Sequence, residues 1–456
     1  MSSALAVKPE PEPIPKAVPP RLTRSVLLGC AGLVLLLAPL CFGAVEPWSI
    51  FALEAAAALL LVTWGIRQWL KQQFEFTGNP VYLPMVAFAG IVMLQWILGS
   101  TTYRHVTYTQ LLLYAAYAML AFVASQSLRR ASQFDYLAKV VAVYGGVVAT
   151  FAVLQGIAPN GKLYWIWPSE QGGAIYGPYV NHNHYAGLME MLTPFPLVLA
   201  ATRLSDGNRR IIFLIIAALM AGSIFLSGSR GGMLAFLVQM GVLAVLLLRS
   251  KKGNWRQPVM LAIFLAAVVG FLVWLGGNDL TRRLASIHSE AHAEISGGTR
   301  LTIDRDGLRM LLKRPALGWG LGTFPVVYPQ FRSFYTTFFV NQAHNDYLQL
   351  LVETGVIGFA VVVWFLVALF RGASAKLKDW NETSSGALTV AALLGCIGIL
   401  VHSFFDFNLQ IPANAALFYV LCALAAAPPL QESQRKRVLR RRHLVIEPGF
   451  SEPPAN

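Results

Sequence analysis

The stretch Asn341-Gln-Ala-His-Asn-Asp-Tyr-Leu-Gln-Leu-Leu-Val-Glu-Thr-Gly355 marks the place where a long polar segment, residues 277–345, meets an apolar run. Most of the chain outside the polar segment is compatible with lipid. A histidine, an amide and a carboxylate at the entry of a membrane helix are costly unless they pair or act. The stretch therefore predicts a boundary of a membrane domain and a functional position at His344.

Composition places the whole chain in the membrane class. Of its 456 residues, 56% are hydrophobic and only 13% are charged, which is too apolar for a soluble globular protein. Apolar runs of about twenty residues are long enough to span a bilayer, and they must be helical to satisfy their own backbone groups. We predict twelve spans, at about 24–43, 48–66, 81–99, 108–125, 138–157, 184–202, 210–227, 231–248, 258–276, 346–370, 386–406 and 412–428.

These spans predict an all-α polytopic membrane protein with a long outer loop between the ninth and tenth helices. The expected organisation is a disordered tail (1–23), nine helices (24–276), the extracytoplasmic loop (277–345), three helices (346–428) and a basic tail (429–456). The first segment is rich in Pro, Glu and Lys and lacks an apolar pattern, which favours disorder.

Basic residues orient the predicted helices. The net charge is +14, and its distribution indicates membrane topology rather than nucleic-acid binding. Arginine and lysine gather in alternate loops, as the positive-inside rule requires of cytoplasmic segments. The cytoplasmic set includes Arg67, Lys71, Arg129, Arg130, Arg209, Arg210, Arg249, Lys251, Arg371, Lys376 and Lys378. Both termini are therefore expected in the cytoplasm and the long loop outside.

Two predicted outer segments are unusual. Residues 158–183 are rich in Tyr and Trp, which indicates either an interfacial belt or a platform for sugar rings. In the long loop, residues 298–314 predict an amphipathic helix that ends at Pro315. Its expected apolar side consists of Leu301, Leu308, Leu311 and Leu312.

Three arginines are candidates for an anion site. Arg230 lies in Ser227-Gly-Ser-Arg-Gly-Gly232 at a predicted helix start, where glycines allow close approach and backbone donors favour phosphate. The alternative is an arginine that anchors the interface. Arg300 opens the loop helix and Arg305 follows it. They form either a second arm of the anion clamp or an ordinary solvated basic face.

His344 is the candidate general base or hydrogen-bond donor, because a histidine titrates near neutral pH. We expect Asn345 and Asp346 to orient its ring. The alternative is a capping or packing residue. Further polar groups at the outer ends of spans are His182, His184, Glu190, His402 and Asp406, of which the last two are four residues apart and would share a helix face. Their spacing matches no metal motif, so a hydrogen-bonded network is the favoured hypothesis.

Together these features resemble the O-antigen ligase superfamily, over about residues 180–410. The resemblance rests on twelve spans, the long outer loop, and the motifs Ser229-Arg-Gly-Gly232, Gly298-Thr-Arg300, Gly318-Trp-Gly-Leu-Gly-Thr-Phe324 and His344-Asn-Asp-Tyr-Leu-Gln-Leu-Leu-Val-Glu-Thr-Gly355. Asn181-His-Asn-His-Tyr-Ala-Gly187 resembles a stretch of some members, with Tyr185 in place of the usual Phe. The superfamily includes O-antigen ligases, Wzy-type polymerases and protein O-oligosaccharyltransferases.

The resemblance implies a GT-C-like glycosyltransferase of the bacterial inner membrane that uses an undecaprenyl-diphosphate-linked glycan and neither a metal nor another cofactor. It implies that Arg230 and Arg300 bind the diphosphate and that His344 acts on the acceptor hydroxyl. The acceptor, which is lipid A core, a growing glycan or a protein, is left open. A transporter is the alternative of a different class, and the sequence shows no clear inverted repeat in its favour.

Overall fold

The computed structural model describes residues 20–72, 74–168, 174–202, 207–249, 259–270, 272–273, 297–336 and 339–431. Its elements, in chain order, are α1 (Pro20–Leu40), η1 (Phe42–Ala44), α2 (Pro47–Lys71), α3 (Tyr82–Ile97), α4 (Arg104–Ser127), α5 (Ala131–Ile157), β1 (Lys162–Leu163), β2 (Trp167–Pro168), α6 (His182–Leu192), α7 (Pro194–Ala201), α8 (Gly207–Leu226), α9 (Arg230–Arg249), α11 (Gly297–Lys313), α12 (Phe324–Val327), η2 (Tyr328–Gln330), α13 (Asp346–Ser374), α14 (Ser384–His402), η3 (Asn408–Gln410) and α15 (Pro412–Ala426). A further apolar helix covers Val259–Gly270. Residues 1–19 and 432–456 of the predicted tails and the start of the predicted outer loop, residues 277–296, lie outside the described residues. Residues 20–23, predicted as the end of the disordered tail, belong to α1.

The chain is mainly helical, and a helix occupies each predicted span. Within the described ranges, seven helices are long and apolar enough to cross a membrane, and four others are apolar but shorter. The predicted sixth span is divided into α6 and α7 at Thr193. Pro194 begins α7, and proline cannot donate the backbone hydrogen bond that would continue α6. The count of twelve transmembrane helices stays a prediction.

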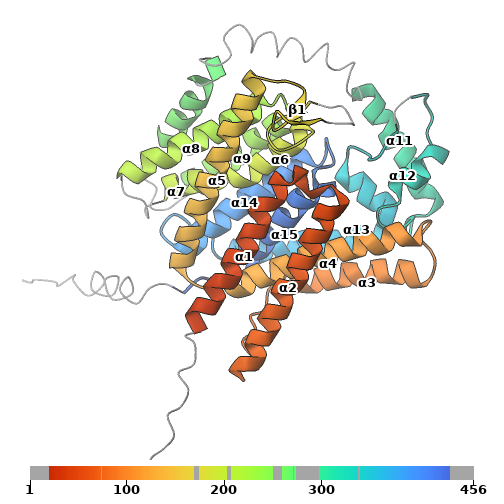
Figure 1. Cartoon of the computed structure of the whole chain (residues 1–456), viewed down its shortest axis with the longest axis horizontal. Coiled ribbons are helices and arrows are strands. Elements are labelled where there is room, and N and C mark those ends of the chain that lie inside the picture. The colour runs from red at the N-terminus through yellow and green to blue at the C-terminus, as the bar shows by residue number, and fades with distance from the viewer. Residues whose placement is uncertain are drawn as a thin grey trace, which may run out of the picture.

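Helices α14 and α15 form the centre of the molecule. Figure 1 shows them between a group made of α1, α2 and α4 and a group made of α5, α7, α8 and α9, with α11 and α12 to one side. Helix α15 packs on α4 and α14, and α14 packs on α9, α6 and α7. Of the apolar window of α14, 78% is buried inside the protein. The ends of these central helices are therefore held from every side.

The predicted loop helix is confirmed as α11, and Leu311 of its predicted apolar side packs against the core, but the other three leucines of that side were placed wrongly. Leu301, Leu308 and Leu312 are 50–77% exposed, whereas Ile303 and Met310 are fully buried. The sequence analysis predicted that the leucines face inward because helical periodicity alone takes no account of the neighbouring elements.

Close packing and a buried carboxylate decide which face of α11 turns inward. Gly307 lies against Leu348 of α13, where an added Cβ would come within 3.0 Å of the leucine side chain. Asp306 is buried and accepts hydrogen bonds from the backbone and hydroxyl of Ser333, at 2.9 and 3.1 Å. A carboxylate buried with such donors fixes the face more firmly than exposed leucines can.

The turn at residues 318–324 docks on α13. Gly318 has φ +69°, and a Cβ there would lie 2.5 Å from the backbone of Glu353, so only glycine fits. The Glu353 carboxylate accepts the backbone N–H groups of Gly322 and Phe324, at 2.8 and 3.1 Å. Gly355, also left-handed at φ +65°, lies against the backbone of Ala316. The two glycine-containing motifs of the sequence thus meet and hold the start of α13 in place.

The aromatic segment at residues 158–183 divides between core and surface. Tyr176 and Tyr179 are buried, and the Tyr179 hydroxyl donates to Asn414 Oδ1 at 2.8 Å. Trp167, in the short β1–β2 hairpin, is 59% exposed. The two tyrosines therefore belong to the core, and of these three aromatic residues only Trp167 presents a broad surface to a membrane interface or a sugar.

Candidate functional site

His344 has an unusual backbone just before α13. Its φ is 55°, in the left-handed region that few residues other than glycine adopt, although histidine does so more often than most. Asn345 ends this bend, because its side chain accepts the backbone N–H of Leu348 at 3.2 Å and caps the helix. Such conformations persist only where the surroundings hold them, and they gather at functional sites.

Asp406 is the carboxylate that faces the His344 ring. The His344 Nδ1 lies 3.3 Å from Asp406 Oδ1, an ion-pair distance at an angle that does not give a hydrogen bond. The other oxygen, Oδ2, accepts Asn183 Nδ2 at 2.6 Å. Asp406 is 1% exposed, so three elements that are distant in sequence meet at one buried carboxylate.

The surroundings of Asp406 favour its ionised form. Burial by itself raises the pKa of Asp406, but His344, and at longer range His184 and Arg300, lower it well below its usual range. The Phe407 ring makes edge-to-face contacts with both imidazoles, with centroids 4.8 Å from His344 and 4.7 Å from His184. The Asp406 carboxylate and the Phe407 ring together restrict the His344 ring.

The predicted partners of His344 have other contacts. Asn345 caps α13, and Asp346 accepts Ser403 Oγ at 2.8 Å and Leu409 N at 3.0 Å. Asp406 was expected to share a helix face with His402, but α14 ends at His402 and Asp406 lies in the following turn. Because Asp406 was assumed to continue the helix of His402, its spacing did not predict the contact with His344 that this turn allows.

Arg300 reaches the same turn from α11. Its Nη1 donates to the backbone oxygen of Phe405 at 2.7 Å, and its Nε has no hydrogen-bond partner among the described residues. Asp304, one turn further along α11, was not singled out in the sequence. Burial raises the pKa of the Asp304 carboxyl, against opposing effects of Asn345, Arg300 and His344. The cluster therefore includes a second carboxyl group close to His344.

Arg305 lies apart from this cluster. It is exposed, and at 3.6 residues per turn it lies about 140° around the helix from Arg300. Arg309, which continues the basic series, pairs with Asp306 at 3.1 Å. The structure thus brings only Arg300, of these three, to the turn that carries Asp406.

Arg230 begins α9 at a tightly packed turn. Ser229 caps the helix by accepting the backbone N–H of Gly232 at 3.2 Å. A Cβ on Gly231 would lie 2.5 Å from the His402 ring. The glycines were expected to admit a ligand; at Gly231, the side chain of His402 takes that space. Arg230 itself is exposed and lies next to this contact.

The remaining polar candidates form pairs. His402 Nδ1 lies 2.8 Å from Glu190 Oε1, and His184 Nδ1 lies 3.4 Å from Asn408 Oδ1. His182 is the first residue of α6 and is half-buried. Across the described residues, no three side chains of His, Cys, Asp or Glu are arranged to hold a metal ion. The polar residues at the ends of α6, α9 and α14 instead form hydrogen-bonded pairs.

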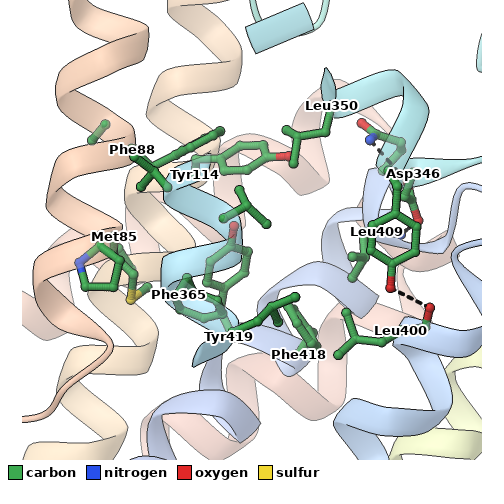
Figure 2. Close-up of a pocket in the computed structure, with 18 of the residues that line it drawn as sticks. Met85, Phe88, Tyr114, Asp346, Leu350, Phe365, Leu400, Leu409, Phe418 and Tyr419 are labelled. Atoms are coloured by element: carbon green, nitrogen blue, oxygen red, sulfur yellow. Dashed lines mark hydrogen bonds between the residues drawn. The ribbon is translucent and has the colours of Figure 1, made fainter. Parts of the chain in front are cut away.

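An apolar pocket opens beside this cluster. The pocket and its opening to solvent together contain about 970 Å³ of space outside the atoms, and Figure 2 shows Met85, Phe88 and Tyr114 on one side and Leu400, Leu409 and Asp346 on the other. Asp346 and Gln410, which hydrogen bond to each other at 3.2 Å, provide its polar end. Since Asp346 is two residues from His344, the pocket leads from an apolar interior towards the site.

Comparison with known proteins gives a match to a protein family. A family model described as O-antigen ligase matches residues 215–363. This range includes Arg230, Arg300, Arg305, His344 and Asp346, but ends before Asp406. No curated protein matches the chain.

Proposed function

Because a family model described as O-antigen ligase matches residues 215–363 and several helices are long and apolar enough to cross a membrane, we propose that this chain is a multi-pass inner-membrane glycosyltransferase of the O-antigen ligase superfamily that moves a lipid-diphosphate-linked glycan onto a hydroxyl acceptor. The donor is of the undecaprenyl type. The reaction takes place on the outer face of the cytoplasmic membrane during synthesis of a surface polysaccharide. The observation that carries this proposal is the His344–Asp406 pair beside Arg300.

In this proposal, His344 activates the acceptor hydroxyl. With Nδ1 turned to Asp406 at 3.3 Å, Nε2 is the nitrogen that accepts the proton of the acceptor hydroxyl. An ionised Asp406 stabilises the imidazolium that forms, as a buried carboxylate does in other histidine-dependent enzymes. The acceptor oxygen then attacks the anomeric carbon of the donor sugar.

The donor half belongs to the arginines. As the new glycosidic bond forms, the bond from the anomeric carbon to the diphosphate oxygen breaks, and the lipid diphosphate leaves with the electron pair. Charge develops on that oxygen, and fixed guanidinium groups stabilise it most strongly where water is excluded. The contact of Arg300 with Phe405 supports this role for Arg300, and the contact of the adjacent Gly231 with His402 supports it for Arg230.

The pocket supports a polyprenyl donor. Its walls come from the apolar faces of α3, α4, α13, α14 and α15, and its polar end adjoins the site. A long isoprenoid chain in this pocket would bring the diphosphate to the start of α13, where Asp346 lies. The same arrangement serves a ligase, a polymerase and a protein O-glycosyltransferase, since they differ in the acceptor.

The decisive experiment measures transfer from a purified lipid-linked glycan donor. We expect His344→Ala to abolish transfer while donor binding persists, and His344→Gln to retain some activity only if hydrogen bonding rather than proton transfer is required. EDTA should have no effect. Full activity in His344→Ala would remove the centre of the proposal, and EDTA inhibition reversed by a divalent ion would show a metal-dependent reaction.

Deletion of the gene separates the members of the superfamily. Envelope glycans analysed by gel and mass spectrometry would show unattached polymer for a ligase and single repeat units for a polymerase. Loss of glycan from proteins alone would identify a protein O-glycosyltransferase. An unchanged glycan profile would contradict all three.

A further inference from the structure

Three fully buried polar side chains from α6, α14 and the turn before α9 are aligned behind the candidate site. His402 Nδ1 lies 2.8 Å from Glu190 Oε1, and His402 Nε2 lies 3.4 Å from Ser229 Oγ. None of the three residues is more than 1% exposed. A substrate at the surface therefore does not touch them.

Burial of these polar side chains costs free energy. Glu190 Oε2 has no hydrogen-bond partner within the described part of the chain, and taking a carboxylate and an imidazole out of water costs free energy that their attraction only partly returns. Well-packed apolar side chains of similar volume would serve stability at least as well. The pair therefore calls for an explanation beyond helix packing.

A second polar contact, made by Gln239, joins α6, α9 and α14. Gln239 of α9 donates through Nε2 to the backbone oxygens of Glu190 and Leu394, at 2.8 and 2.7 Å. It lies nine residues along α9 from Arg230, which is about 13 Å at 1.5 Å per residue. Gln239 thus joins α6, α9 and α14 away from the site, and His402 joins them beside it.

His402 contacts both halves of the candidate site. On one side its ring fills the space over Gly231, next to Arg230. On the other, its backbone oxygen accepts the N–H groups of Phe405 and Asp406, at 2.8 and 3.1 Å. Phe405 accepts Arg300 and Asp406 faces His344. One residue therefore connects the turn that carries Arg230 with the turn that meets Arg300 and His344.

We infer that Glu190 and His402 are positioning residues that hold the Arg230 turn in register with the Asp406 turn. The hydrogen bond between Glu190 Oε1 and His402 Nδ1 fixes the orientation of the His402 ring, so that Nε2 reaches Ser229 and the ring atoms Cδ2 and Nε2 lie against Gly231. Arg230 then lies at a fixed distance from the turn that contacts both Arg300 and His344. The inference rests on the proposed function, in which both arginines contact the diphosphate.

The test compares Glu190→Gln and His402→Gln with a matched control, Gln239→Met, in purified protein that keeps its wild-type melting temperature. Misplacing a substrate-positioning group by about 1 Å can cost about 10²-fold in rate. We expect kcat/KM for the lipid-linked donor to fall about 10- to 100-fold in Glu190→Gln, with the larger part in KM for the donor. The acceptor KM should not change, and Gln239→Met should stay within about threefold of wild type. If His402→Gln fails to fold, Glu190→Gln carries the test.

A double-mutant cycle with Arg230→Ala decides how the pair acts. If Glu190 works through Arg230, adding Glu190→Gln to Arg230→Ala should change kcat/KM by less than about twofold. Multiplicative losses, wild-type kinetics in Glu190→Gln, or an equal loss in Gln239→Met would each overturn the inference while the proposed function stands. Wild-type kinetics in both Arg230→Ala and His344→Ala would instead overturn the proposed function, and the inference with it.

Discussion

Two clusters centred on carboxylates, one at Asp406 and one at Glu75, show how differently this chain handles charge. Asp406, near the start of α13, is 1% exposed and has partners on other elements, including Asn183, which is 223 residues away. Glu75 lies between α2 and α3 in the chain. Its side chain is 34% exposed and accepts from cations only 4, 8 and 51 residues away.

The two clusters differ in their surroundings and in their expected roles: Asp406 belongs to the candidate functional site, whereas Glu75 pairs with basic side chains outside that site. At Glu75, Arg24, Arg67 and Lys71 meet one oxygen, Oε2, at 2.8–3.2 Å, and water can reach this carboxylate because its side chain is 34% exposed. At Asp406 water is excluded, so each partner is needed and a change is felt by all of them. The comparison predicts a large loss of activity from one cluster and a small loss of stability from the other.

The largest expected effect is at Asp406. Asp406→Asn removes the charge that faces His344 but keeps a side chain that can bond to Asn183 after an amide flip. General acid–base catalysis contributes about 10²–10⁴-fold, and we expect kcat for transfer to fall by that amount. Steady-state kinetics with saturating donor is the measurement. A variant within twofold of wild type would show that Asp406 only supports the fold.

The next effect separates two arginines of α11. Arg300→Ala should cost about 2–4 kcal/mol of transition-state stabilisation, as loss of a donor to a developing oxyanion does. Lysine should rescue it poorly, because lysine lacks the planar fork of a guanidinium.

Arg305→Ala is the matched control for Arg300, since it removes the same charge from the exposed face of the same helix. We expect its kcat/KM to remain within about twofold of wild type, the scale of a surface change. Equal losses in the two variants would show that net charge, rather than the Arg300 contact, attracts the donor.

The smallest expected effect is at Glu75. Burial by itself raises the pKa of Glu75, but hydrogen bonds from Arg67 and Lys71 and the charge of Arg24 lower it below its usual range. A lowered folded-state pKa gives stability that is present above the unfolded value, about 4.3, and is lost as pH falls through the folded value.

Glu75→Gln should therefore lower the free energy of unfolding at pH 7 by about 0.2–1 kcal/mol, the range for partly exposed pairs. The difference from wild type should shrink below about pH 4, and transfer activity should not change. Thermal melts of the purified protein at several pH values measure it. A difference that grows on acidification would contradict the sign of this linkage.

Much of the site was visible in the sequence, but its connections were not. His344, Arg230 and Asp406 stood out as polar residues at the ends of apolar runs, and Arg300 stood out at the start of the predicted loop helix. The partner of His344 was placed at Asn345 and Asp346, since neighbours in sequence are the only neighbours that a pattern supplies. Asp304 was missed because it lies within a charge run of a type that is usually solvated.

The sequence by itself determined the membrane class, the positions of the apolar helices and the existence of α11. These follow from hydropathy and from the need of each span to satisfy its own backbone, which are local properties of the chain. The tertiary structure decided where α14 ends, which face of α11 is buried, and that Asp406 meets His344. Those outcomes depend on close packing and on buried hydrogen bonds between residues far apart in the chain, and no local period encodes them.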